Sequence, residues 1–176
     1  AHFKLSLQLA GRDLPKALWL LRLVYSGGMP NEAGAELFDH DLDIRHGFVQ
    51  WRSQLYRVMG ERATASSGAV IAHHMAPLST VLKSLRETEQ EAKNKGGRNA
   101  FSIRVIKRSG GRVDLTLPWW IGEGSDAVST MHALETLREA IASDMSRRAA
   151  YHADEWVRRF PLFEHLSELE GLIAQN

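Results

Sequence analysis

Acidic and histidine side chains gather between residues 39 and 46 at a spacing that a metal ion could use. The stretch holds Asp39, His40, Asp41, Asp43 and His46, and carboxylates and imidazoles are common metal ligands. A calcium loop also needs a central glycine and a closing glutamate, and this stretch has neither. We therefore favour helix capping and a solvated turn over a cation site.

Two adjacent histidines, His73 and His74, form a second candidate. Neighbouring residues on a strand point to opposite faces, so the pair would bind one ion only where the backbone bends. The chain has no cysteine, and no third ligand stands at a useful spacing. The prediction is a polar strand end with one ring packed and one in water, and no metal site.

A glycine pair, Gly27-Gly28, follows the apolar stretch 23–25. Glycines after a buried strand let the chain turn tightly or approach a ligand closely. Metal or phosphate chemistry would call for carboxylates next, but Met29 and Pro30 follow. The residues alone leave open whether this turn has lost its chemistry or is only a turn. We assign no catalytic residue, because no nucleophile elbow or P-loop is present.

Composition limits the classes of protein to which the chain can belong. The 176 residues are 44% hydrophobic and 24% charged, with 22 basic and 21 acidic residues and a net charge of +1. These values are typical of a globular protein and argue against a free-standing nucleic-acid binder. No apolar run approaches the roughly 18 residues of a membrane span, and residues 1–4 do not begin a signal peptide.

Hydrophobic spacing predicts the elements that position these residues. Along residues 1–121 they are a helix over much of 3–18 with a boundary near Asp13, a strand over 20–26, a short helix over 31–38, a helix over 44–58, a strand over 63–72, a helix over 77–95, and a hairpin of strands over 101–105 and 113–117. Trp119-Trp120 should plug the edge of the core rather than stack on a base. Residues 126–176 hold no convincing strand.

The predicted fold class is α+β, with two domains. Strand-helix-strand steps need crossover connections, which gives residues 1–122 a small sheet covered by helices, of ferredoxin-like or palm type. Residues 123–176 should form a small all-helical domain. Fold alone does not give function.

Residues 63–111, "ATASSGAVIAHHMAPLSTVLKSLRETEQEAKNKGGRNAFSIRVIKRSGG", closely resemble the second palm domain of the large subunit of type III CRISPR effector complexes. The likeness is greatest to the subtype III-B form. It rests on a Ser-x-Gly strand, His-His, x-x-Pro-Leu, a helix ending Glu-x-x-Ala-Lys, and a Gly-Arg-Asn-Ala-Phe strand. The C-terminal part resembles the family's helical domain with fewer motifs.

The resemblance implies a function. These palms are relatives of the GGDEF nucleotide cyclases and make cyclic oligoadenylate from ATP with divalent metal, when target RNA binds the complex. The family also implies partners, namely other effector subunits and guide and target RNA, and a cytoplasmic location. By resemblance, the nucleotide-binding residues are Gly27 and Gly28 at the turn, Ser66 and Gly68 in the pocket strand, and Lys93 facing the triphosphate.

The sequence departs from the family at the turn. The family reads Gly-Gly-Asp-Asp and a short apolar strand, whereas Gly28 is followed directly by Met29-Pro30. Without the metal-binding aspartates, two-metal phosphoryl transfer lacks its carboxylates. We expect an inactive palm with a structural or nucleotide-binding role. The alternatives are an active ATP cyclase whose Gly-Gly-Asp-Asp segment is missing from this sequence, and a degenerate GGDEF-like signalling module.

Overall fold

The computed structural model describes residues 13–28, 42–60, 62–122, 127–143 and 148. The chain divides into two compact units, residues 1–135 and 136–176. The predicted domain boundary at 122–123 falls inside the first unit, and as a statement about domains it stays a prediction. The expected helices over 3–12 and 31–38 and the C-terminal helices beyond residue 143 lie outside the described residues, apart from Arg148.

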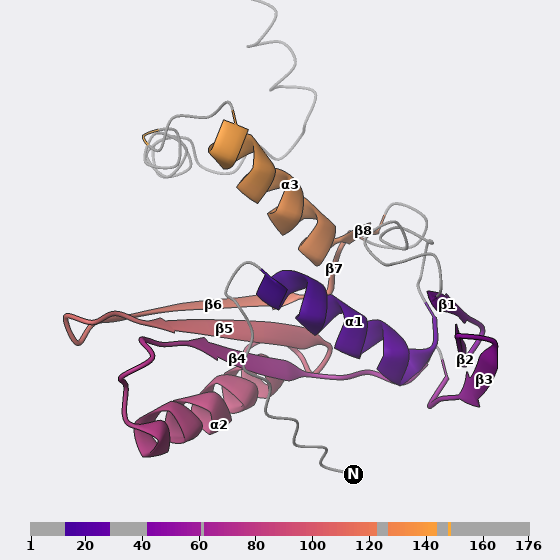
Figure 1. Ribbon diagram of the computed structural model, residues 1–176, viewed down its shortest axis with the longest axis horizontal. Coiled ribbons are helices and arrows are strands. Elements are labelled where there is room, and N and C mark those ends of the chain that lie inside the picture. Colours follow the sequence, from indigo (N-terminus) through magenta and orange to yellow (C-terminus); the bar gives the residue numbers. More distant parts are fainter. Residues whose placement is uncertain (1–12, 29–41, 61, 123–126, 144–147, 149–176) are drawn as a thin grey trace, which may run out of the picture. The chain divides into compact units, whose positions relative to one another are not determined.

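A three-stranded sheet forms the centre of the first unit. Its order is β4 (Ser67–Ile71), β5 (Ala100–Ile106) and β6 (Arg112–Pro118), with β4 parallel to β5 and β5 antiparallel to β6. The helix α2 (Leu78–Asn94) makes the crossover between β4 and β5 and packs on one face of the sheet (Figure 1). The expected strand-helix-strand-strand order is confirmed, and this arrangement is compatible with a palm domain.

The opposite face of the sheet carries the core. Period-two alternation places Phe101 and Ile103 on this face, while Ser102 and Arg104 point toward α2. Helix α1 (Leu14–Ser26) covers the apolar face and contributes to a core of Leu18, Trp19, Leu23, Ala69, Phe101, Trp119 and Met131. Trp119 is fully buried, which confirms the prediction that it plugs the core.

The strand predicted over 20–26 is wrong, because these residues continue α1 to Ser26. Short apolar runs fit a buried strand and a buried helix equally well. The buried positions Leu18, Trp19, Arg22, Leu23 and Ser26 recur with helical period. Pro15 lies in the first turn of α1, where its missing N–H costs nothing, so the boundary expected near Asp13 is confirmed.

The helix predicted over 44–58 is also wrong. The segment forms an antiparallel sheet of β1 (Leu42–Arg45), β2 (Phe48–Trp51) and β3 (Gln54–Arg57). Two-residue turns with positive φ at both positions connect the strands: His46 and Gly47 (49° and 80°), then Arg52 and Ser53 (47° and 65°). Such turns match the twist of hairpin strands. The apolar residues at helical spacing are mostly exposed on these strands.

Two short strands and a helix follow the central sheet. β7 (Trp120–Ile121) pairs with β8 (Val128–Ser129), which corrects the expectation of no strand after residue 126. Helix α3 (Thr130–Ser143) begins directly after β8, at the helical spacing read from the sequence. One described helix does not test the all-helical domain, which stays a prediction. In the described part of the chain, no helix has the length and hydropathy of a membrane span.

Candidate functional site

Gly27 ends helix α1, and its neighbours require a glycine. Its φ of 62° is left-handed, and its N–H donates to the carbonyl oxygen of Leu23 over 2.7 Å. Its own carbonyl accepts from the N–H of Gly47 over 2.5 Å. A side-chain Cβ at Gly27 would lie 2.3 Å from Cγ2 of Val58 and 2.7 Å from the Gly47 backbone. The first predicted site residue is therefore a helix C-cap pressed against the β1–β2 turn, not the end of a strand.

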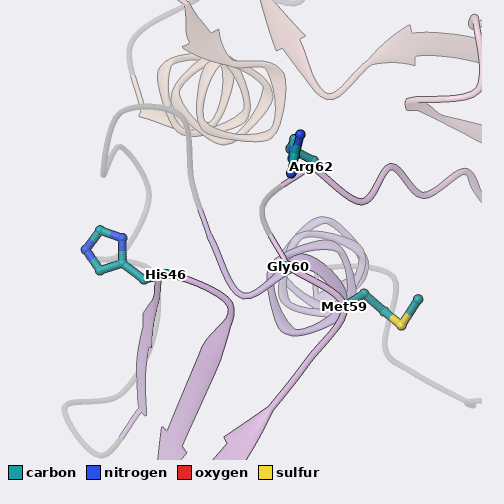
Figure 2. A pocket seen from close by; sticks show the side chains of 4 residues that line it. All are labelled: His46, Met59, Gly60 and Arg62. Carbon is teal, nitrogen blue, oxygen red and sulfur yellow. The ribbon is translucent and has the colours of Figure 1, made fainter.

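A hollow of about 340 Å³ adjoins this contact. The described residues that line it are His46, Met59, Gly60 and Arg62, the chain neighbours of Gly47 and Val58. Figure 2 shows the side chains of His46, Met59 and Arg62 pointing in different directions rather than toward one another. These lining residues offer no carboxylate and no converging set of polar atoms. Gly28, the second glycine of the pair, is buried next to this turn.

Gly68 serves the contact between β4 and α2. A Cβ there would lie 2.6 Å from the backbone nitrogen of Glu89 and 2.9 Å from its Cα, so only glycine lets the helix approach the strand this closely. Gly68 thus marks a close approach of two backbones, as a glycine inside a strand often does. Ser66 lies half-buried just before β4. Nothing in these contacts tests nucleotide binding by either residue.

Lys93 lies near the C-terminal end of α2 and is engaged within its own helix. Its Nζ donates to Oε1 of Glu89 over 2.6 Å, and its side chain is 27% exposed. Because α2 runs antiparallel to β4 and Glu89 packs on Gly68, one further helical turn brings Lys93 level with Ser66. The structure thus gathers Ser66, Gly68 and Lys93 at one end of the β4–α2 pair. Gly27 belongs to a different contact, against Gly47 and Val58.

The candidates Asp39, His40 and Asp41 lie outside the described residues. Among the residues that are described, no group of three or more His, Asp or Glu is suitably placed for a metal ion. His73 and His74 lie beyond the end of β4, and their rings stack with centroids 4.3 Å apart. The backbone has therefore bent, and the rings do not point to opposite faces as on a regular strand. Both histidines are exposed, so the prediction that one ring is packed is wrong. Asp43 pairs with Arg45 over 2.6 Å.

The sequence reasoning missed a buried arginine under α2. Arg104 on β5 is 1% exposed and donates through Nε and Nη2 to both oxygens of Asp114, over 2.7 and 3.0 Å. It also donates to Glu87 over 2.7 Å and to Glu91 over 3.1 Å. The hydrogen bond with Asp114 raises the pKa of Arg104 and lowers the pKa of Asp114. The signal that could have revealed it was an arginine on the strand face that the predicted crossover helix, rich in glutamate, would cover.

A second buried arginine, Arg22 on α1, has no such partners. It is 4% exposed and donates from Nη2 to Oδ1 of Asn99 over 3.2 Å. Burial lowers the pKa of Arg22, and the nearby Tyr25 acts in the opposite direction. The strand predicted over 20–26 concealed this residue, because only a helix turns it and Trp19 to the same side.

Comparison with known families agrees with the sequence motifs. The family model of the Cas10/Cmr2 second palm domain matches residues 20–102, which run from α1 to the start of β5 and include all five predicted nucleotide-binding residues. No curated protein and no solved structure matches the chain. Residues 20–102 are thus similar to the second palm domain of Cas10-type large subunits of type III CRISPR effector complexes, and the α+β architecture of the unit is compatible with that likeness.

Proposed function

We propose that this chain is a catalytically inactive palm segment of a III-B-like large subunit, with a structural role in a cytoplasmic effector complex. The observation that carries the proposal is the junction after Gly28, where Met29 follows without an aspartate pair. In two-metal phosphoryl transfer, divalent cations stabilise the attacking and leaving oxygens, and carboxylate ligands hold these cations in place. The described residues beside the turn are His46, Met59, Gly60 and Arg62, which do not fit a two-metal centre.

An assay of oligoadenylate synthesis tests the inactivity. The full chain is incubated with ATP and Mn²⁺, alone and with the other effector subunits and target RNA, beside a large subunit that carries an intact Gly-Gly-Asp-Asp turn. We expect product from the intact subunit and none from this chain. The proposal is contradicted when this chain makes linear or cyclic oligoadenylate at a rate comparable to that of the intact large subunit. Sequencing the DNA between the codons of Gly28 and Met29 decides whether a segment was omitted.

A structural role needs a docking surface, and the sheet offers one. Ile71, Val105 and Val113 form one cross-strand row on the face that α1 covers elsewhere, and Ile103 and Leu115 lie in the next. The outer members are exposed, with Ile71 at 36%, Val113 at 50% and Leu115 at 39%. In Figure 1 the β5–β6 hairpin extends beyond α1. The exposed hairpin end also carries Lys107, Arg108 and Arg112.

The occupant that this surface fits is a protein subunit with an apolar patch edged by acidic residues. Apolar rows would supply the buried area, and the basic hairpin end would select an acidic rim. Replacing Val113 and Leu115 together by serine should reduce assembly with the other subunits about tenfold or more. The matched control is Leu55→Ser, which removes a side chain that is 65% exposed on β3. Unchanged assembly of the double variant, measured by size-exclusion chromatography, contradicts this docking face.

Residual ATP binding is a second candidate function, favoured by the position of Lys93 level with Ser66. An ammonium at 27% exposure can leave Glu89 for a phosphate, because such paired surface charges hold each other with well under about 1 kcal/mol. Calorimetry with ATP should give weak binding that Lys93→Ala abolishes and that Lys83→Ala, an exposed lysine of the same helix, leaves unchanged. Equal affinities for both variants would remove Lys93 from the site.

A further inference from the structure

Arg22 is a buried cation whose hydrogen bonds are incomplete. Its guanidinium lies 4.9 Å from the ring centroid of Trp120, and Nη2 donates to the neutral amide oxygen of Asn99. Nε and Nη1 are buried and have no hydrogen-bond acceptor. No carboxylate of the described residues forms an ion pair with Arg22. A guanidinium carries only donors, so the two nitrogens can be satisfied only by oxygen atoms from elsewhere.

Two further donors without a partner lie around the same tryptophan. The Nε1 of Trp19 and the Oγ1 of Thr130 are buried and unbonded. The ring of Trp19 meets that of Trp120 edge-on with centroids 5.3 Å apart. Thr130 follows Ser129, the β8 residue that pairs with Trp120. We call this region the Trp120 corner, formed by Trp19, Arg22, Trp120 and Thr130.

The Trp120 corner has the composition of an anion site. An uncompensated buried charge is strongly unfavourable, and buried charges are therefore paired with a counter-ion and hydrogen-bonded. Here the guanidinium, the indole N–H and the hydroxyl group each have a donor that is not used. Glu135, a buried acid on α3, makes an interaction of its own but no ion pair with Arg22. An anion with several acceptor oxygens would supply the acceptors that these donors lack.

We propose that the Trp120 corner binds a phosphate group, either free or on a nucleotide. A phosphate group offers more acceptor oxygens than a carboxylate, which suits donors that come from α1 and from the start of α3. Arginine is also the side chain best suited to phosphate recognition. Because Arg22 is only 4% exposed, the anion enters when the corner opens locally, and association is slow. The inference stands on this geometry and does not depend on the proposed function.

Calorimetry and stopped-flow tryptophan fluorescence test the proposal on the full chain. Inorganic phosphate and ATP are titrated separately, with chloride at matched ionic strength as the blank. We expect saturable binding. Arg22→Met should weaken the affinity about tenfold to a hundredfold, because hydrogen bonds to charged groups contribute a free energy of that size. The matched control is Arg86→Met, which removes one positive charge from an exposed position on α2 and should leave binding unchanged.

A milder variant guards against a fold defect in Arg22→Met. Thr130→Val removes only the hydroxyl donor and should weaken binding by about fivefold, with an unchanged far-ultraviolet circular dichroism spectrum. Tighter binding of ATP than of phosphate identifies a nucleotide as the source, and equal binding identifies free phosphate. The proposal is overturned when neither probe binds, when only carboxylates such as acetate bind, or when Arg86→Met weakens binding as much as Arg22→Met does.

Discussion

Two buried arginines lie on opposite sides of the same sheet, and their surroundings differ sharply. On the α2 side, Arg104 is surrounded by Asp114, Glu87 and Glu91. On the α1 side, Arg22 has one neutral hydrogen-bond partner and an aromatic ring. Both are at most 4% exposed, so the contrast is one of partners and not of burial.

The two interfaces differ in how many of their buried polar groups have hydrogen-bond partners. Around Arg104 almost every donor and acceptor is used, and only Oε2 of Glu91 lacks a partner. Such a network fixes how α2 packs on β5 and β6, because removing Arg104 leaves carboxylates of both elements without the donor that they share. Around Trp120 the unpaired atoms are mainly donors. The polar groups on the α2 side therefore have a structural role. The unpaired donors on the α1 side are the ones available to an external ligand.

The largest expected effect comes from Arg104→Met. This change removes the buried cation that three carboxylates share and leaves them only the outer ion pairs with Arg112 and Lys95. We expect it to lower the free energy of unfolding by about 3 kcal/mol. Urea unfolding at neutral pH measures it, with Arg86→Met as control within about 0.5 kcal/mol of the native chain. A loss of unfolding free energy no larger than that of Arg86→Met would show that the Arg104 network does not stabilise the fold.

Gly68→Ala should have the next largest effect, because a Cβ would meet the backbone of Glu89. Overpacking against backbone that cannot move aside costs about 1–3 kcal/mol, in contrast to the usual small gain when glycine in a strand is replaced. The clash-free comparison is Gly110→Ala at φ 92°, where nothing lies within 4 Å. Thermal unfolding of both variants separates the steric cost from backbone strain. Unchanged stability of Gly68→Ala would show that α2 does not pack tightly on β4.

The ion network also predicts a pH dependence. The hydrogen bond from Arg104 lowers the pKa of Asp114 in the folded state, so the folded state is stabilised while Asp114 is ionised. This contribution is complete above the ordinary aspartate pKa of about 3.9 and is lost as pH falls through the lowered folded value. The stability difference between the native chain and Asp114→Asn should therefore shrink in acid. Urea midpoints measured at decreasing pH test this, and a constant difference would contradict it.

The smallest effect is expected for Arg22→Met in phosphate-free buffer. Because the charge has no counter-ion, replacing it with an apolar chain of similar length should leave stability unchanged within about 1 kcal/mol, or raise it. Adding phosphate should then stabilise the native chain and not the variant, as thermal unfolding would show. A loss as large as that of Arg104→Met would erase the contrast between the two arginines.

Much of the central sheet could be predicted from local pattern. The alternation in 101–105 and 113–117, the turn over 108–112 and the glycine at position 68 gave β5, β6 and the tight contact of β4 with α2. The errors lie where pattern is ambiguous. The segment 20–26, in which five of seven residues are apolar, was assigned as a strand but continues α1. The spacing over 44–58 matched a helix by coincidence, while two turns of positive φ made hairpins.

The candidate site was predicted in part, and for a similar reason. Motif resemblance named Gly27, Gly28, Ser66, Gly68 and Lys93, and their contacts give Gly27, Gly68 and Lys93 structural roles while nucleotide binding stays a prediction. Neither arginine was singled out, because a buried charge is recognised by what surrounds it. The partners of Arg104 stand 10 to 17 residues away in sequence, and Asn99 stands 77 residues from Arg22.

The sequence by itself determined the α+β order of the central sheet, the likeness to a Cas10-type palm and the direct junction of Gly28 with Met29. These three features depend only on the order of residues along short stretches of the chain and on which residues stand there. Only the tertiary structure decided that Gly27 caps a helix, that Gly68 admits α2, and that one buried arginine is neutralised and the other is not. Burial and pairing are set by segments distant in the chain, and electrostatic free energy depends on those distances rather than on local sequence.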